Sequence, residues 1–294
     1  MCKVNLVPRK KRKMIIDVII DSFIDSIKLL PFLFVTYLLM EHLEHKAGDK
    51  MRAAIHNAGK EGPVIGGILG IFPQCGFSAA ASNLYAGRII TMGTLLAVFL
   101  STSDEMLPIM ISENVGIAMI IKVLAVKVIV AVLTGFVIDF IFRKREKKMQ
   151  IEHLCEQHHC HCENGIWKSA IHHTVEIFLY ILFISLVLNL VIAWIGEDAL
   201  GSIILNRPLV ATLIAGLIGM IPNCAASVIV TQLYLDGVLG AGAMIAGLLS
   251  GSGVGLLVLL RVNDDRGENM RIVGILYIVG VAAGIAIEML GITF

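Results

Sequence analysis

Long apolar stretches follow one another along this chain and are separated by short polar breaks. Eight of them are long enough to cross a bilayer as helices, which takes about 20 residues. They run over Ile15–Met40, Pro63–Ala86, Ile89–Ile111, Val115–Phe142, Ile171–Ile195, Pro208–Leu235, Val238–Leu260 and Ile272–Phe294. Lipid offers no partner to an open backbone group, and the alternation typical of a membrane barrel is absent from this pattern. The pattern therefore predicts an all-α polytopic membrane protein.

The two halves of the chain repeat one pattern at an interval of 149 residues, the separation of Ile65 from Ile214. A gapless alignment of Ile65–Ile111 with Ile214–Leu260 gives 14 identities in 47 positions. The identities include Gly, Pro, Cys, Ser and Tyr residues, which shared hydrophobicity alone would not align. We therefore expect an internal duplication. Its parts are a first transmembrane repeat over 1–145, a Cys/His-rich linker over 146–168 and a second transmembrane repeat over 169–294.

The pattern leaves the number of crossings in each repeat open. Basic residues collect within residues 3–13 and again within 143–148, and the positive-inside rule places both clusters in the cytoplasm. That arrangement needs an even number of crossings in the first half and makes the repeats parallel, whereas inverted repeats need an odd number. The Gly-rich stretch 62–86 fits either a re-entrant hairpin or two short spans.

Each half carries the motif G-x-x-P-x-C-x-x-S inside an apolar stretch. Proline removes a backbone donor and clashes with a carbonyl one turn earlier, so carbonyls near Leu69–Gly70 and Ile218–Gly219 are expected to be free. At membrane depth such groups are tolerated only inside protein or around a cavity, and matching breaks in two repeats are typical of secondary transporters. The alternative is that these small residues allow close helix packing. The predicted transport site takes from this motif Pro73, Gln74, Cys75, Ser78, Pro222, Asn223, Cys224 and Ser227.

The run Ser101–Glu105 places two adjacent carboxylates inside an apolar stretch. Charges at that depth are costly and indicate function, unless the pair sits at a helix end among lipid head groups. The second half keeps the serines of this run and lacks its acids, as one coupling or cation site would require. Lys127, near the middle of Val115–Phe142, needs a partner; one of these acids is the obvious candidate, and a snorkelling side chain or a structural ion pair is the alternative. The predicted transport site therefore also includes Ser101, Ser103, Asp104, Glu105, Lys127, Ser250 and Ser252.

The central linker holds seven Cys and His residues within ten positions, 153–162. Thiolates and imidazoles bind zinc, copper(I) or cadmium, but the spacing differs from the paired ligands of a folded zinc finger. We expect a flexible cytoplasmic loop that collects or senses metal, in a compartment that keeps its cysteines reduced. The predicted metal ligands are Cys75, Cys224, Asp104 and Glu105 in the membrane and His153, Cys155, His158, His159, Cys160, His161 and Cys162 in the linker.

Composition narrows the function further. Of the 294 residues, 57% are hydrophobic and 16% are charged, against about one quarter charged in ordinary soluble domains. The formal net charge of +1 gives no bulk attraction to nucleic acid. Neither a P-loop nor an H-E-x-x-H motif occurs, which argues against a P-loop nucleotidase and a zincin-type protease. We expect a protein that is not an enzyme and has no cofactor.

Three features together resemble a family of bacterial membrane proteins. They are the twin breaks Pro73–Gly76 and Pro222–Ala225, the run Ser101–Glu105 and the Cys/His-rich linker. The family is described as ten-transmembrane heavy-metal exporters, with members labelled arsenic efflux protein or manganese transporter, and the resemblance extends over nearly the whole chain. It implies ten spans, which the eight stretches reach if each Pro-broken stretch is split at its proline. It also implies metal or metalloid efflux, with functional positions at Cys75, Cys224, Asp104 and Glu105.

The sequence thus predicts a secondary active carrier, multi-pass in the bacterial inner membrane, that exports a divalent heavy-metal cation. Its site is expected between the two Pro-x-Cys breaks, and protons taken up by the two acids would accompany the return. Manganese or a similar transition metal fits oxygen ligands, whereas zinc or cadmium fits sulfur. Efflux of trivalent arsenic or an organoarsenical is one alternative, and a membrane-anchored metal sensor is another. The expected partners are the lipid bilayer, the metal cation and a coupling proton; a homodimer is left open, and no nucleic acid is expected.

Overall fold

The computed structural model describes residues 61–142 except 73, 74, 104 and 105, residues 208–294, and scattered single positions within 20–38 and 167–187. All regular elements assigned in this part of the chain are α-helices. In chain order they are α3 (Gly62–Leu69), α4 (Cys75–Ala86), α5 (Met92–Ser101), α6 (Met106–Ser112), α7 (Ile117–Phe142), α11 (Pro208–Gly219), α12 (Cys224–Leu235), α13 (Ala241–Ser250), α14 (Gly255–Val262) and α15 (Arg266–Met289). The predicted Cys/His-rich linker lies outside the described residues.

Four helical segments in the described part are long and apolar enough to cross a membrane, namely Met92–Ser112, Ile117–Phe142, Ala241–Val262 and Arg266–Met289. The first joins α5 with α6, and the third joins α13 with α14. α7 and α15 hold large apolar side chains such as Leu133 and Ile278 at the molecular surface, where lipid rather than water would surround them. These helices define an all-helical membrane protein, as the apolar pattern predicts.

The stretch Pro63–Ala86 is long enough to span, but it folds as a hairpin of α3 and α4. α3 runs beside α5 in the same direction, because Gly62 abuts Thr94 near the start of α5 and Gly70 abuts Ser101 at its end. A Cβ atom on these two glycines would lie 2.2 and 2.0 Å from the respective hydroxyl oxygens. α4 then leads back to the start of α5. The hairpin therefore enters and leaves the helical bundle at the same end.

Helix starts recur at the interval that relates the two halves of the sequence. α4, α5, α6 and α7 begin at residues 75, 92, 106 and 117, and α12, α13, α14 and α15 begin 149 residues later, at 224, 241, 255 and 266.

α15 begins before the apolar stretch Ile272–Phe294 because Asp265 caps it: its carboxylate accepts the Glu268 N–H at 3.0 Å.

Two carboxylates hold the long helices to the starts of the buried ones. Asp139, in the last turn of α7, accepts the Gly93 N–H (2.8 Å) and the Thr91 hydroxyl (2.7 Å) at the start of α5. Glu288, in the last turn of α15, accepts the Gly242 N–H (3.1 Å) at the start of α13. The first N–H groups of a helix have no partner within it, and the helix dipole favours negative charge there. Asp139 thus holds α7 to the start of α5, and Glu288 holds α15 to the start of α13.

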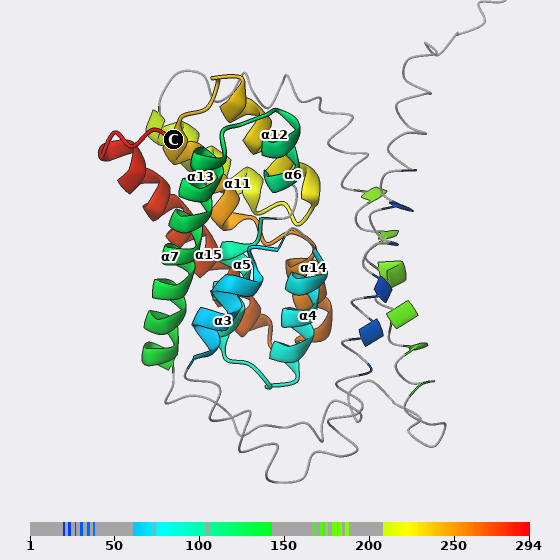
Figure 1. The fold of residues 1–294 in the computed structure, drawn as a ribbon. Coiled ribbons are helices and arrows are strands. Elements are labelled where there is room, and N and C mark those ends of the chain that lie inside the picture. The colour runs from blue at the N-terminus through cyan, green and yellow to red at the C-terminus, as the bar shows by residue number, and fades with distance from the viewer. Residues whose placement is uncertain are drawn as a thin grey trace, which may run out of the picture.

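α7 and α15 run in opposite directions (Figure 1). The start of α5 and the end of α7 lie at one end of the molecule, and the start of α15 lies there too, because Arg88 in the α4–α5 turn pairs with Glu268 at 2.8 Å. We call this the Arg88 end. Burial alone would lower the pKa of Arg88, but the Glu268 carboxylate raises it above its ordinary value. At the opposite end, here the Glu288 end, the start of α13 meets the end of α15.

α4 and α12, which begin 149 residues apart, each pack against a broken span of the other half. α4 packs against α14 and α12 against α6, and α5 contacts α13 between these pairs; the pairs lie at opposite ends of the bundle in Figure 1. The α4–α14 contact is close: the Ser82 hydroxyl donates to the Gly255 carbonyl at 2.7 Å. α5 and α13 form the core, since all their residues except Met92 are buried.

We expect Gly93→Ala and Gly242→Ala to lower the free energy of unfolding by about 1–3 kcal/mol, the usual effect of overpacking. The added Cβ would lie 2.1 Å from the Gly135 carbonyl oxygen in the first case and 2.4 Å from that of Gly284 in the second. Gly274→Ala in α15 is the matched control, because nothing lies within 4 Å of its Cβ. Thermal melting in detergent measures the effect. Equal melting temperatures for all three variants would contradict the close packing of α5 on α7 and of α13 on α15.

Candidate functional site

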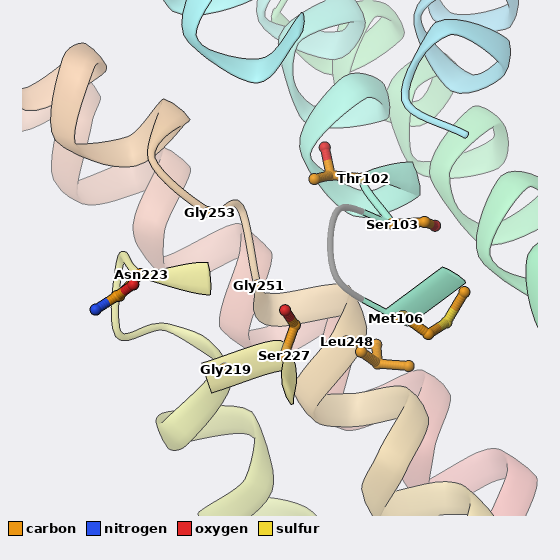
Figure 2. A pocket seen from close by; sticks show the side chains of 9 residues that line it. All are labelled: Thr102, Ser103, Met106, Gly219, Asn223, Ser227, Leu248, Gly251 and Gly253. Atoms are coloured by element: carbon orange, nitrogen blue, oxygen red, sulfur yellow. The ribbon is translucent and has the colours of Figure 1, made fainter. Parts of the chain in front are cut away.

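A small cavity lies where broken helices of the two halves meet. Its volume is about 20 Å³, enough for one water molecule or one bare ion. Residues from α6, α11, α12 and α13 and from the connections after α5, α11 and α13 line it, as Figure 2 shows. They are Thr102, Ser103, Met106, Gly219, Asn223, Ser227, Leu248, Gly251 and Gly253. Because both halves contribute, the cavity exists only when the halves are packed together.

Three interruptions of helices supply most of the lining. Thr102 and Ser103 follow α5, Asn223 lies between α11 and α12, and Gly251 and Gly253 lie between α13 and α14. The C-terminal end of α11 and the N-terminal end of α12 therefore both face this region, with partial charges of opposite sign. The described lining offers hydroxyl, amide and carbonyl oxygens and one thioether, so it can ligate a cation without a formal charge of its own.

The hydroxyl groups of the first half donate to their own backbone. Thr102 Oγ1 donates to the Val98 carbonyl at 2.8 Å, and Ser103 Oγ donates to the Ser101 carbonyl at 2.9 Å. Ser101 Oγ in turn donates to the Ala97 carbonyl at 2.8 Å. These bonds shape the break after α5, and they direct each hydroxyl proton to the backbone. The oxygen lone pairs remain available as acceptors, which is the arrangement that a cation requires.

The corresponding hydroxyl groups of the second half differ. Ser250 and Ser252 are buried, and within the described part of the chain their Oγ atoms have no hydrogen-bond partner. Gly280 packs so closely on Ser250 that a Cβ there would lie 2.4 Å from its Oγ. Buried hydroxyls without partners are rare in proteins and call for a bound water or ion. Among the described residues, the serine hydroxyls beside the α13–α14 connection thus lack the hydrogen bonds that those beside the α5–α6 connection make.

Lys127 reaches the same region from α7. Its side chain is fully buried, with 0% exposure. It lies on the stripe of α7 that faces the bundle, together with Val123 and Ala131. The ammonium group donates a hydrogen bond to the carbonyl of Thr102, a residue that lines the cavity. A positive charge therefore stands beside the break at the end of α5.

The structure brings Ser103, Asn223 and Ser227 of the predicted transport site to one cavity. Ser78 and Ser101 are buried in the surrounding helices, and Pro222 lies half-buried beside Asn223. Six lining residues did not belong to the predicted transport site. Gly219 belongs to the G-x-x-P-x-C-x-x-S motif, and Thr102, Gly251 and Gly253 lie inside runs that the two halves share. For the remaining two, Met106 and Leu248, the sequence carries no signal.

Several predicted residues lie outside what the structure describes. Cys75 and Cys224 are the first residues of α4 and α12, but their side chains lie outside the described part of the structure. So do Pro73, Gln74, Asp104, Glu105, His153, Cys155, His158, His159, Cys160, His161 and Cys162. Within the described ranges no group of three or more His, Cys, Asp or Glu residues could hold a metal. The predicted ligand sets therefore stay predictions.

The expectation of free carbonyls near each break is wrong for Leu69 and Ile218. The Leu69 carbonyl accepts the Phe72 N–H at 3.3 Å, and the Ile218 carbonyl accepts the Ile221 N–H at 3.0 Å. Both helices end in a tighter turn that satisfies these acceptors, which is a common helix ending. The Gly219 carbonyl instead points toward the α13–α14 connection, since its oxygen would lie 3.4 Å from a Cβ on Gly251.

A comparison with protein families matches residues 10–198 to a family described as "Putative, 10TM heavy-metal exporter". The match covers more than half of the 294 residues, so the chain belongs to this family of membrane proteins, as its sequence motifs indicate. The matched range is shorter than the resemblance implied, because the break Pro222–Ala225 lies beyond residue 198. Comparisons with curated proteins and with solved structures gave no match.

Replacing Asn223 with aspartate tests whether metal binds in the cavity. Asn223→Asp adds one carboxylate to the lining, so we expect the dissociation constant for manganese(II) or cadmium(II) to fall about tenfold. The rise of melting temperature with metal concentration in detergent measures it. Asn114→Asp is the matched control, because Asn114 is exposed and its φ of 53° suits Asp as well as Asn. An unchanged dissociation constant in Asn223→Asp would place metal binding elsewhere.

Proposed function

We propose that this chain is a secondary carrier that exports a heavy-metal cation, and that the cavity between its halves is the cargo site. Membership of the exporter family supports the direction and the class of cargo. The observation that carries the proposal is the meeting of three helix interruptions at one buried, oxygen-lined cavity. Transporters place their sites where broken helices of two repeats face each other.

The two halves are inferred to be inverted repeats of one unit. Their helix starts keep the 149-residue interval, and equivalent contacts occur at opposite ends: Asp139 with Gly93 at the Arg88 end, and Glu288 with Gly242 at the Glu288 end. Inversion supports alternating access. If the two halves exchange conformations, a site that was open to one side of the membrane becomes open to the other side. Inversion argues against the parallel alternative that the positive-inside rule favours.

The distribution of arginine supports a cytoplasmic position for the Arg88 end. Arg88, Arg261, Arg266 and Arg271 belong to the turns and helix ends there, and basic residues next to spans mark the cytoplasmic side. The basic segment that follows α7 is attached at this same end. A single crossing by Ile15–Met40 would then put the basic N-terminal segment on the other side, so the rule holds for one cluster and not for both.

The proposed cargo is a divalent transition metal such as manganese, exported in exchange for protons. Ser103 and Met106 line the cavity, and the chain carries Asp104 and Glu105 between them. These acids would supply the charge that the described lining lacks, and they would bind protons after release of the metal. Cys75 and Cys224 would shift preference toward zinc, cadmium or trivalent arsenic, since sulfur favours softer elements.

The transport test uses cells that express the full chain. We expect wild type to lower cell-associated manganese, and Asp104→Asn/Glu105→Gln to restore it to the level of cells without the protein, because the neutral pair cannot balance a divalent charge. Glu113→Gln/Asp236→Asn is the matched control, since both of these acids are exposed. Cells are loaded in parallel with zinc, cadmium, cobalt and arsenite. A fall in arsenite alone would favour the metalloid alternative, and no change in any element would reject metal efflux.

The linker separates a carrier from a sensor. Serine at all seven Cys and His positions of 153–162 is expected to keep export within about twofold, because the carrier needs the linker only to collect metal. Element content of cells at saturating manganese measures this, with the unmodified chain at the same membrane abundance as the reference. Complete loss of export in the serine variant would support the hypothesis of a membrane-anchored metal sensor.

A further inference from the structure

We propose that Lys127 is a tethered cation that occupies the cargo's place beside the α5–α6 break while the cavity is empty. Arriving metal displaces the ammonium group, and the ammonium group returns when the metal leaves. This inference rests on the proposed function and adds to it the group that competes with the cargo. It assigns to α7, which contributes nothing to the cavity lining, a part in the transport cycle.

The burial of Lys127 is the first observation. Among the described residues it is the one charged side chain that is buried. Only six of the 26 residues of α7 are buried, so a lysine could have faced outward at little cost, as Lys122 does on the same helix. An ammonium group at membrane depth is expensive to maintain without partners. Its inward position therefore indicates a use for the charge inside the bundle.

The position of the ammonium group is the second observation. It donates to the Thr102 carbonyl at the point where α5 has ended, and the C-terminal end of a helix attracts positive charge. The same carbonyl belongs to a residue of the cavity lining, and carbonyl oxygens are ligands for metal cations. Two cations cannot share this small region without strong repulsion, so bound metal and the inserted ammonium group exclude each other.

The difference between the halves is the third observation. The counterpart of Lys127 at the 149-residue interval is Leu276, which is also buried at the equivalent place of α15. The counterpart of Thr102 is Gly251, and the acids after Thr102 have no acidic counterparts. The same helical frame therefore accepts leucine at this position. Packing does not require a lysine, and the charge accompanies the half that carries the acids.

A tethered cation has a defined effect on transport. It competes with metal for the empty site and so weakens apparent affinity, but it also assists release and neutralises the acids during the return of the empty carrier. Removing it should therefore lower both KM and Vmax. This combination separates it from a structural role, because a damaged site raises KM or leaves it unchanged.

The experiment measures initial uptake rates in liposomes that contain the purified full chain, with manganese(II) and, in parallel, cadmium(II) as probes. Lys127→Met and Lys127→Leu remove the charge, and leucine is the residue that the second half carries. We expect KM to fall by about fivefold and Vmax by about tenfold in both. Lys127→Arg should keep KM within about twofold. Lys122→Met and Leu276→Met are the controls and should match wild type.

Three outcomes would overturn the inference. A KM that is unchanged or higher in Lys127→Leu, with wild type active, makes Lys127 a structural residue. If both neutral variants fail to fold, as judged by melting temperature, packing does require the lysine and the argument from Leu276 fails. If wild type itself transports neither metal, the proposed function fails and this inference fails with it, a result visible in wild type alone.

Discussion

Backbone groups without partners are costly in hydrocarbon, and this chain nevertheless interrupts its apolar helices between α5 and α6, between α11 and α12 and between α13 and α14. Thr102, Ser103 and Asn223, which lie in these interruptions, are all buried. Tight turns satisfy the carbonyls of Leu69 and Ile218, and side-chain hydroxyls bond to the backbone around α5. These bonds give the backbone near the interruptions partners that lipid does not supply.

The two halves use one frame for different chemistry. The frame is visible in the equal spacing of helix starts and in the paired contacts of Asp139 and Glu288. The residues differ at equivalent positions, because Lys127 corresponds to Leu276, and the two acids of the first half correspond to glycine and valine. Equal spacing of the helices thus coexists with a charge that only the first half carries at this position. The hydroxyls of Ser250 and Ser252, which have no hydrogen-bond partner among the described residues, lie in the half without this charge.

The ends of the bundle also differ. Arg88 and Glu268 form an ion pair that joins the halves at one end. At the 149-residue interval Arg88 corresponds to Gly237, whose φ of 73° suits glycine and which has no side chain to pair. Among the described residues, this ion pair therefore has no counterpart at the equivalent place of the second half.

The sequence by itself determined the class of protein and much of the scaffold. Apolar length fixed the helical membrane fold, since lipid allows few other solutions. Identities at a constant interval, such as Pro73 with Pro222, fall in the segments between α3 and α4 and between α11 and α12. The same reasoning selected Ser103, Asn223 and Ser227, which line one cavity.

Only the tertiary structure decided which breaks meet and which ends face each other. Apolar periodicity is the same for a full span and for a hairpin, so it could not show that Pro63–Ala86 turns back. Thr102 and Gly251 entered the site through contacts between the halves, and Lys127 reached it through the packing of α7 on α5. These relations depend on contacts between residues far apart in the chain, which a local pattern of hydrophobic and polar positions does not encode.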